Sequence, residues 1–280
     1  LRDYLRATIS AKGYNPAEFV CFSYGGAGPV HTYGYTEGLN FRDVVVPAWA
    51  AGFSAFGCAC ADFEYRYDKS VDLALPHLAS DDEKVDACKI IQSAWAQLAS
   101  KVIDEFVING FKPEDVLLRP GYRMQYMGQL NDLEITSPVS SATTAADWDQ
   151  IVAAFENTYG RVYASSARSP ELGFSVTTAI MRGLVATQKP GLPEDPDGGP
   201  APPDSARLGT RPFYRHKKWA KATIWKMEAL QAGNHIVGPA IIESDATTFV
   251  VPTGFETTLD KHRLFHLKEV ARKTDKEWPE

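Results

Sequence analysis

The residues best placed to do chemistry lie in a glycine-rich turn, GGAGP, at residues 25–29. An apolar run at residues 18–24 precedes the turn and small residues follow from Val30, so the pattern predicts a strand, a turn and a helix. Glycines at such a turn let a ligand approach the backbone closely, and the N-terminus of the following helix favours anions. Many α/β proteins place glycine there only for packing. The spacing therefore leaves nucleotide contact and simple packing both open.

Two other kinds of residue in the same part of the chain suit ligand binding. His31, directly after the turn, fits a ligand or acid–base role, or else a histidine satisfied by backbone partners. Cys58 and Cys60 would place two thiols on one side of an extended segment. A zinc site needs two more ligands nearby and the sequence offers no second pair, so packing of small buried side chains is favoured.

Charged residues near the C-terminus offer further alternatives. Glu243 and Asp245 suit general acid–base or metal chemistry, although such residues more often shape a hairpin turn. Residues 211–226 hold six Lys or Arg among four aromatic residues, a pattern that fits base stacking, an edge strand with solvated charges, or a subunit interface. The net charge of −6 argues against a nucleic-acid partner. The sequence contains no P-loop, Ser-His-Asp signature or HExxH motif.

Hydrophobic periodicity predicts the elements that must position these residues. Helices are expected at residues 1–12, 81–110 and 147–163, with Asp81 and Asp82 favouring the start of the second helix and Gly110 its end. Residues 117–136 read as a strand pair. The remaining expected strands lie at residues 18–24, 44–47, 63–75, 174–182, 222–227, 240–244, 247–251, 257–259 and 264–267. We expect residues 50–61, which are rich in Ala, Gly and Cys, to pack closely against a neighbour.

Composition limits the class of protein. Of the 280 residues, 44% are hydrophobic and 23% are charged, as in ordinary globular domains. Four irregularly spaced cysteines indicate a reducing compartment, and no apolar run approaches the roughly 18 residues that cross a bilayer. We therefore expect a cytoplasmic protein with no membrane partner. The chain starts at Leu1 without a signal peptide and runs directly into a core strand, which suggests part of a longer polypeptide; a short chain with a processed start is the alternative.

The predicted organisation has four parts. Residues 1–78 and 79–187 read as two α/β or α+β regions, and residues 211–280 as a small β-rich terminal module. Residues 188–210 contain six prolines and four glycines. Such a segment buries too little apolar surface to order itself, so it is expected to be a linker or a mobile loop.

Several segments carry a family resemblance. FSYGGAGPVH (residues 22–31), PAWAAGFSAFGCACADF (47–63) and YRMQYMGQLNDLEI (122–135) are similar to segments of the hydantoinase A and oxoprolinase family. Residues 209–219 and 236–267 more closely resemble the C-terminus of the hydantoinase-A-like subunits of acetone-type ketone carboxylases. The resemblance covers nearly all of the chain. Members of this type are two to three times longer, which implies a C-terminal portion.

The resemblance also implies a fold and a site. Residues 1–78 would form the end of an actin-like, ribonuclease H-like ATPase domain, in which a paired-glycine turn lies against the adenosine of ATP. The matching positions here are Gly25, Gly26, Ala27 and Gly28. The family's motifs for the ATP phosphates and Mg²⁺ have no match in this sequence, so this portion alone is not expected to turn over ATP, and its catalytic residues stay unassigned.

The implied activity is ATP-dependent carboxylation of a small ketone, acetone with bicarbonate giving acetoacetate. Both reactants would be phosphorylated, carbon dioxide released beside the enolate, and a carbon–carbon bond formed. The implied partners are a hydantoinase-B-like subunit and a small subunit, with Mn²⁺ or another transition metal on a partner. Three alternatives remain: an acetophenone-type carboxylase, an ATP-dependent hydantoinase or 5-oxoprolinase that hydrolyses a cyclic amide, and a non-catalytic assembly module.

Overall fold

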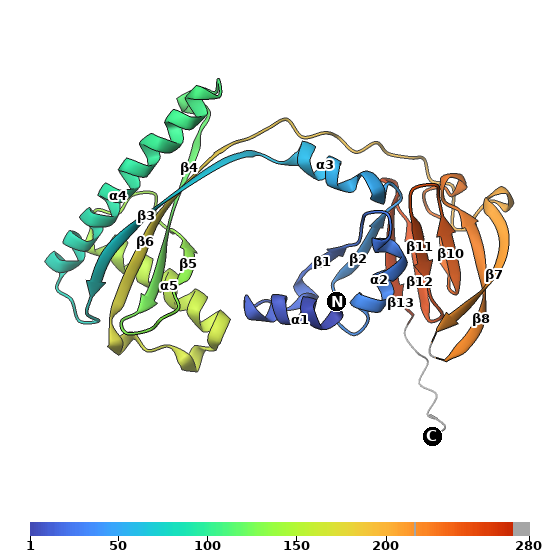
Figure 1. Cartoon of the computed structure of the whole chain (residues 1–280), viewed down its shortest axis with the longest axis horizontal. Coiled ribbons are helices and arrows are strands. Elements are labelled where there is room, and N and C mark those ends of the chain that lie inside the picture. The colour runs from blue at the N-terminus through green and yellow to red at the C-terminus, as the bar shows by residue number, and fades with distance from the viewer. Residues whose placement is uncertain (216, 271–280) are drawn as a thin grey trace. The chain divides into compact units, whose positions relative to one another are not determined.

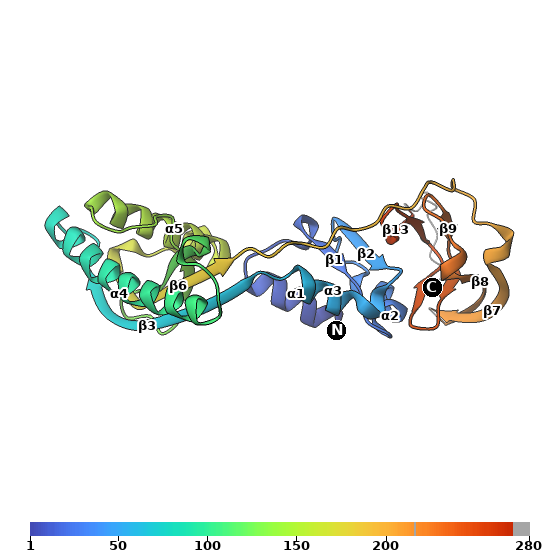
Figure 2. The ribbon, with the colours of Figure 1, turned by 90° about the horizontal axis from the view of Figure 1, so that it is seen from above.

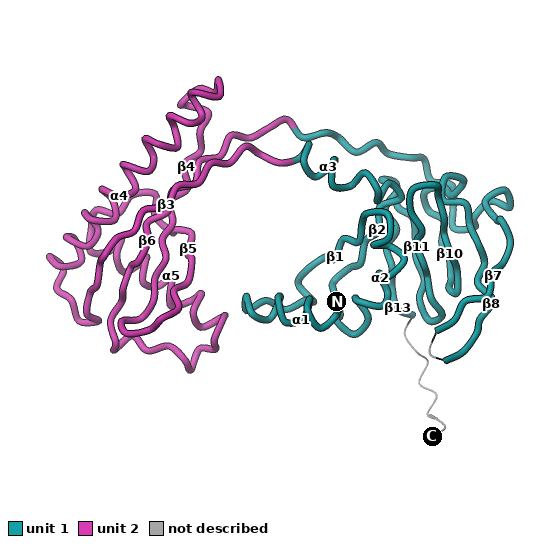
Figure 3. Tube along the Cα trace, in the orientation of Figure 1, with its two compact units in different colours: residues 1–60, 189–280 teal, residues 61–188 magenta. Residues whose placement is uncertain are grey.

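A computed structural model describes residues 1–215 and 217–270 of the chain. The fold is mixed α/β and α+β with three separate sheets, as the sequence predicted. Contacts divide the chain into two compact units, residues 1–60 with 189–280 (unit 1) and residues 61–188 (unit 2), shown in different colours in Figure 3. The boundary after residue 188 lies one residue from the predicted boundary at residue 187, whereas the division has no boundary at residue 78 or 210.

Unit 2 is built on a four-stranded antiparallel sheet in the order β3-β6-β4-β5 (Figure 1). Its strands are β3 (Phe63–Leu75), β4 (Leu117–Tyr126), β5 (Leu133–Thr136) and β6 (Phe174–Val185). The predicted extended segment 63–75 and the predicted strand pair 117–136 are both present. β3 belongs to this sheet because it pairs with β6 along almost its whole length.

Two amphipathic helices cover one face of this sheet, α4 (Asp81–Ile108) and α5 (Ala145–Tyr163). Each begins with a capping box, Ser80 with Glu83 and Thr144 with Asp147, which satisfies the first free N–H groups of the helix. α4 therefore starts one residue after a serine cap that the sequence analysis missed. Gly110, with φ +86°, follows its C-terminal end.

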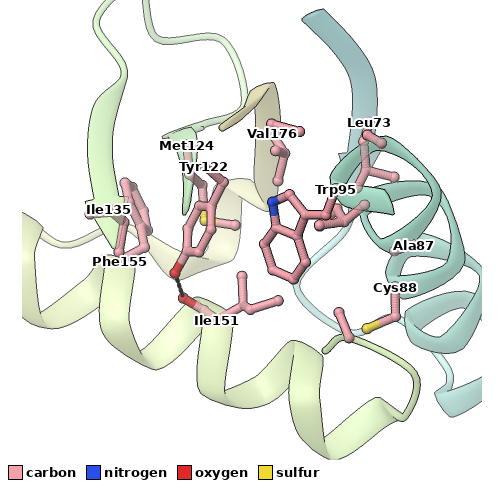
Figure 4. Packing of buried hydrophobic residues seen from close by; sticks show 14 of the residues in the cluster. Leu73, Ala87, Cys88, Trp95, Tyr122, Met124, Ile135, Ile151, Phe155 and Val176 are labelled. Atoms are coloured by element: carbon pink, nitrogen blue, oxygen red, sulfur yellow. Dashed lines mark hydrogen bonds between the residues drawn. The ribbon is translucent and has the colours of Figure 1, made fainter. Parts of the chain in front are cut away.

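The core of unit 2 lies between these helices and the sheet (Figure 4). Trp95, Tyr122 and Phe155 are almost wholly buried. The two polar groups among them are satisfied, since Trp95 Nε1 donates to Gly121 O at 2.8 Å and the Tyr122 hydroxyl donates to Ile151 O at 2.7 Å. These bonds fix α4 and α5 at defined positions on the sheet.

The opposite face of the sheet carries a row of charges. Tyr65 and Tyr67 pack against the core, so the alternating Arg66 and Asp68 of β3 lie on the other face. Arg66 donates to Asp68 at 2.8 Å and to Glu134 at 3.0 Å, and Arg182 from the neighbouring strand pairs with the same Glu134.

Unit 1 contains a five-stranded sheet in the order β1-β2-β13-β12-β9. Its strands are β1 (Val20–Phe22), β2 (Asp43–Pro47), β9 (His235–Val237), β12 (Phe255–Leu259) and β13 (Leu264–Glu269). β1 and β2 are parallel, whereas β13 runs antiparallel to β2 with Phe265 opposite Val46. The two ends of the chain therefore share one sheet.

A second sheet of unit 1 has the order β11-β10-β8-β7, and both views place β7 at its outer edge (Figures 1 and 2). Its strands are β7 (Arg207–Arg215), β8 (Lys218–Lys226), β10 (Ala240–Glu243) and β11 (Thr248–Val251). A shared core of apolar side chains, including Ile242, Phe249 and Phe265, lies between the two sheets. Residues 211–280 thus do not pack only among themselves.

The helices of unit 1 are α1 (Arg2–Ala11), α2 (Gly28–Thr36) and α3 (Phe53–Cys60). Residues 50–61 were expected to pack closely against a neighbour; Ala50 is fully buried, whereas none of the residues of α3 is. Seven short 3₁₀ helices complete the described secondary structure: Pro16–Glu18, Ala50–Gly52, Pro113–Asp115, Ser165–Ala167, Pro170–Leu172, Asp204–Ala206 and Met227–Ala229.

Residues 188–210, predicted to be a linker or a mobile loop, follow unit 2 along the chain and form hydrogen bonds with unit 1. Backbone bonds fix this segment to unit 1: Asp195 N donates to Lys261 O at 2.7 Å, and His235 N donates to Pro200 O at 2.8 Å. Asn234, which is 1% exposed, donates from its side chain to Gly199 O at 2.8 Å. Hydrogen bonds therefore order a segment that has little apolar surface to bury.

The described helices include none that is long and apolar enough to span a membrane.

Candidate functional site

The glycine-rich turn connects β1 to α2, as the sequence predicted. β1 is extended beyond Phe22 by a bond from Ser23 N to Val45 O at 2.8 Å. The chain then turns at Gly25, whose φ of +89° lies in the left-handed region that favours glycine. Gly25 N donates to Ala50 O at 2.8 Å, which fixes the turn to the segment after β2. α2 begins at Gly28, with Pro29 in its first turn.

The other glycines of the turn are not required by the packing of the described chain. A Cβ added at Gly26 would lie 3.6 Å from Ala246 O, and one at Gly28 would lie 3.8 Å from Ser23 Oγ, both ordinary contacts. Neither residue has a positive φ. An alanine would therefore fit at both positions, and a ligand or another segment that approaches the backbone is a further reason for glycine there.

The tip of the β10–β11 hairpin forms hydrogen bonds with the glycine-rich turn. Thr247, which is 5% exposed, places its hydroxyl 3.0 Å from Gly26 O and 3.2 Å from Gly25 O. Ser244 closes the hairpin tip, because its hydroxyl accepts hydrogen bonds from Ala246 N at 3.3 Å and Thr247 N at 3.1 Å. Since Thr247 occupies the carbonyl side of the turn, the amide side remains for a ligand.

Ser23, which directly follows β1, is joined to α2 by side-chain hydrogen bonds. Its hydroxyl, in a side chain that is 1% exposed, accepts from Thr32 Oγ1 at 2.6 Å and from the Tyr35 hydroxyl at 2.5 Å. Burial raises the pKa of Tyr35, which keeps its phenol protonated and able to donate, although the hydrogen bonds with Ser23 and Thr32 oppose the rise. These bonds fix the direction of the α2 N-terminus.

The amide side of the turn is open. Gly26 and Ala27 are exposed, and their N–H groups meet no acceptor among the described residues. α2 has no side-chain N-cap, so its first N–H groups add to this set of free donors. Backbone donors at a helix N-terminus bind oxygen atoms of anionic or ribosyl groups.

Exposed aromatic rings lie beside the turn. Phe53 of α3 stacks on Phe22 with ring centroids 5.4 Å apart and lies 4.9 Å from the ring of Tyr24. Phe22 and Tyr24 remain 43% and 46% exposed. Open donors next to flat apolar rings can bind a ligand that has a polar part and a planar part.

The other candidate ligand-binding residues that the sequence analysis named do not form one site together with this turn. His31 is exposed on α2, beside a hollow of about 600 Å³ that Arg2 and Asp3 also line. Cys58 is exposed and Cys60 half-buried on α3, so the expectation of buried packing is wrong for Cys58. A helical rather than an extended backbone also separates the two thiols to different sides.

The two acidic residues near the C-terminus, Glu243 and Asp245, lie at the tip of the β10–β11 hairpin. Glu243 ends β10 and lies 3.7 Å from Arg211, and Asp245 is exposed in the turn that Ser244 closes. The hairpin-turn interpretation is thus confirmed for Asp245. Within residues 1–215 and 217–270, no three His, Cys, Asp or Glu side chains are grouped so that they could hold a metal ion.

Sequence reasoning missed Ser23 and Thr247. Ser23 carried a usable signal, because a small hydroxyl residue between a buried strand and a glycine turn is well placed to bond the following helix. Thr247 carried no such signal, since its partners are more than 220 residues away in the sequence.

Comparison with known proteins places this site in a family. The hydantoinase/oxoprolinase family model matches residues 1–67, and the hydantoinase/oxoprolinase C-terminal domain matches residues 78–270. The chain therefore belongs to the hydantoinase/oxoprolinase family, as its motifs predicted.

Two curated relatives are carboxylase subunits. The chain is 66% identical to the acetone carboxylase beta subunit of Xanthobacter autotrophicus, over 96% of this chain and 38% of that protein. It is 31% identical to the acetophenone carboxylase gamma subunit of Aromatoleum aromaticum, over 95% of this chain and 36% of that protein. The chain thus spans a little over a third of the length of these relatives.

Solved structures support the same fold. A nucleotide-free structure of acetone carboxylase, described for ATP-dependent acetone carboxylation, superposes with a TM-score of 0.71 over 96% of this chain and 38% of that one, at 66% identity. The ATP-dependent caprolactamase of Pseudomonas jessenii superposes with a TM-score of 0.79 over 94% of this chain and 37% of that one. At 22% identity, the caprolactamase likeness shows the fold alone.

Proposed function

We propose that this chain is part of the ATP-binding subunit of an ATP-dependent ketone carboxylase, which converts acetone and bicarbonate to acetoacetate. The observation that carries the proposal is the 66% identity to an acetone carboxylase subunit over 96% of the chain. This identity extends over both compact units. Relatives with other reactions are much less similar, with 31% identity for the acetophenone carboxylase subunit and 26% for the caprolactamase subunit.

The glycine turn fits one side of a nucleotide. In this proposal, the free N–H groups of Gly26 and Ala27 donate to the ligand, and Phe22 and Tyr24 offer ring faces beside it. Gly25 and Gly28 shape the backbone so that the ligand can approach. Thr247 and Ser23 touch no ligand in this arrangement; they hold the turn and the α2 N-terminus at fixed positions.

The metal ions of the proposed reaction are assigned no ligands in this chain. Among the described residues no three His, Cys, Asp or Glu side chains are grouped, so we derive no step through Mg²⁺ or Mn²⁺ from them, and in this proposal the transition metal lies on a partner subunit. The proposed partners are a hydantoinase-B-like subunit and a small subunit. The need for ATP makes the cytoplasm the expected compartment.

The chemistry explains why ATP is required. A methyl ketone is a poor nucleophile and bicarbonate a poor electrophile, so both need activation and must be held together away from water. ATP supplies phosphoryl groups for that activation. The part of this chain is to bind and orient the nucleotide through the turn at residues 25–28.

The test uses the intact complex that contains this chain. The complex is incubated with ATP and ¹³C-bicarbonate together with acetone or acetophenone, and separately with ATP and hydantoin, 5-oxoproline or caprolactam. We expect labelled acetoacetate from acetone, with ATP consumed in proportion, and no ring opening. Labelled product from acetophenone but not from acetone contradicts the assignment of acetone as the substrate. Hydrolysis of a cyclic amide also contradicts it.

A cyclic amide hydrolase is the second candidate, favoured by the 26% identity to the caprolactamase alpha subunit of Pseudomonas jessenii over 94% of this chain. A non-catalytic assembly module is the third, favoured by the lack of the family's phosphate-binding motifs in this sequence. Nucleotide binding separates the third candidate from the other two. If Gly26→Ala leaves ATP binding of the intact complex unchanged, the turn does not contact nucleotide. That result would favour the non-catalytic assembly module over the two enzymes.

A further inference from the structure

The β7–β8 hairpin, residues 207–226, concentrates positive charge on an acidic chain. It contains seven Arg or Lys and no Asp or Glu, whereas the whole chain has a net charge of −6. Two of the seven are paired, because Arg211 lies 3.7 Å from Glu243 and Arg215 lies 2.9 Å from Glu37. The other five have no ion-pair partner among the described residues and are exposed: Arg207, Lys217, Lys218, Lys221 and Lys226.

Two large aromatic side chains are exposed at the end of the same hairpin. Tyr214 and Trp219 lie directly opposite each other in the strand register, with ring centroids 5.1 Å apart. They are 54% and 71% exposed. Lys221 is two residues from Trp219 in β8 and therefore lies on the same face of the hairpin. Trp and Tyr are among the residues that most often dominate the energy of protein interfaces.

The hairpin is accessible because β7 is the outer strand of its sheet (Figures 1 and 2). Backbone pairing with a further strand is hindered, since Pro212 lacks an N–H group and the register shifts between Arg207 and Gly209. Recognition through the side chains of the exposed face is therefore favoured over strand addition.

We propose that this hairpin is a docking surface for an acidic patch on a partner subunit of the carboxylase. The inference rests on the proposed function, which places the chain in a multi-subunit enzyme. Charge complementarity indicates the kind of partner, because five unpaired cations attract carboxylates. The exposed pair Tyr214 and Trp219 supplies apolar contact area. A long polyanion such as RNA is disfavoured, because the surrounding chain is acidic and repels it.

Photo-crosslinking within the intact complex tests the contact directly. Trp219 is replaced by the photoreactive p-benzoylphenylalanine, and Leu130, which is 98% exposed in unit 2, is replaced in a control. We expect a crosslink from position 219 to a partner subunit, at a segment rich in Asp and Glu. A crosslink to RNA, to a second copy of this chain or to an uncharged segment overturns the proposal, as does an assembled complex with no crosslink.

Charge reversal tests the energetics. The double variant Lys217→Glu, Lys221→Glu is compared with Lys101→Glu, which reverses an exposed cation of α4 that has no ion pair in the described chain. We expect the double variant to bind the partner subunits about tenfold more weakly at low salt and with a smaller salt dependence. Trp219→Ala should weaken binding about 30-fold, as for a central aromatic contact. The thermal unfolding of each variant checks that the fold is intact.

The outcomes separate this inference from the proposed function. Equal partner affinity for the double variant and Lys101→Glu overturns the docking surface even if acetone is carboxylated. A complex that assembles through the hairpin but opens a cyclic amide overturns the proposed reaction and leaves the surface supported. A native preparation that contains this chain alone contradicts both.

Discussion

The hydroxyl of Thr247 lies 3.0 Å from the carbonyl oxygen of Gly26, and this contact joins segments 221 residues apart in the sequence. A residue of the C-terminal part of the chain therefore helps to shape a turn near the N-terminus. The two segments fold as one unit because β13 pairs with β2 and brings the ends of the chain into one sheet. The glycine turn accordingly depends on side chains beyond its own strand and helix.

The first prediction concerns Thr247→Val, which keeps the shape of the side chain and removes its hydroxyl. The carbonyl groups of Gly25 and Gly26 lose a hydrogen-bond donor, so the free energy of unfolding should fall by about 0.5–1.5 kcal/mol. If the turn binds ATP, the KM for ATP of the intact complex should rise several-fold while kcat changes less, because Thr247 positions the turn and does not touch the reacting atoms. Denaturant unfolding and steady-state kinetics measure the two effects.

Two further variants control this experiment. Thr247→Ser keeps the hydroxyl and should restore the KM. Thr257→Val is the matched control, because Thr257 is 1% exposed and its hydroxyl has no hydrogen-bond partner in the described structure. Its removal should leave stability unchanged or increase it. A KM that rises equally in Thr247→Val and Thr257→Val would show that general loosening of the unit, and not the contact with the turn, is responsible.

The second prediction separates two glycines of the turn. Gly25→Ala forces a side chain into φ +89° and should destabilise the protein by about 1–2 kcal/mol. Gly26→Ala meets only an ordinary contact with Ala246 O at 3.6 Å, so its stability should stay within about 0.5 kcal/mol of the parent. If a ligand approaches the backbone closely at Gly26, as the proposed function requires, ATP binding should nevertheless weaken in Gly26→Ala. Calorimetric titration of both variants with ATP distinguishes the effects.

The α-helices other than α3, and most strands, could be predicted from the sequence because their patterns are local. The spacing of Trp95 and its neighbours identified α4, and Gly110 marked its end. The pairing of β13 with β2 could not be predicted, because periodicity does not say which strands become neighbours. For the same reason residues 211–280 read as a separate module. The hydrogen bonds of residues 188–210 could not be predicted either, because they connect this segment to turns that are distant in the sequence.

The candidate site was predictable only in part. Gly25 followed from the strand–turn–helix pattern, whereas the exposure of Cys58 did not follow from composition. An apolar segment such as α3 is expected to be buried, yet the described chain leaves it uncovered. The turn itself was thus easier to predict than the side chains that hold it in place.

The third prediction tests the core of unit 2. Tyr122→Phe removes a hydroxyl that donates to Ile151 O at 2.7 Å in a fully buried position. The free energy of unfolding should fall by about 1–2 kcal/mol, because the carbonyl of a helix residue loses its donor. Ile151→Ala should cost about 2–5 kcal/mol through the cavity it leaves. If Tyr122→Phe is as stable as the parent in urea unfolding, the hydrogen bond does not contribute to the docking of α5.

The last prediction concerns the charged face of unit 2 and its dependence on pH. Burial is the largest influence on Glu134 and raises its pKa, but the hydrogen bonds from Arg182 and Arg66 together outweigh it, so the pKa lies below the usual value. Because the folded-state pKa is lowered, Glu134 contributes stability above its unfolded pKa of about 4.3, and this contribution is lost as pH falls through the folded pKa. The free energy of unfolding should therefore fall as the pH is lowered below about 4.3.

Glu134→Gln isolates this contribution from that of other carboxylates. The variant should be less stable than the parent at pH 7, because Arg66 and Arg182 lose their shared ionic partner. The difference should shrink as pH falls below about 4.3, where the parent also loses the charge. Glu114→Gln is the control, since Glu114 is exposed and forms no ion pair in the described chain. A stability difference between Glu134→Gln and the parent that stays constant from neutral to acidic pH would contradict the assignment, because it would show that the loss comes from packing and not from charge.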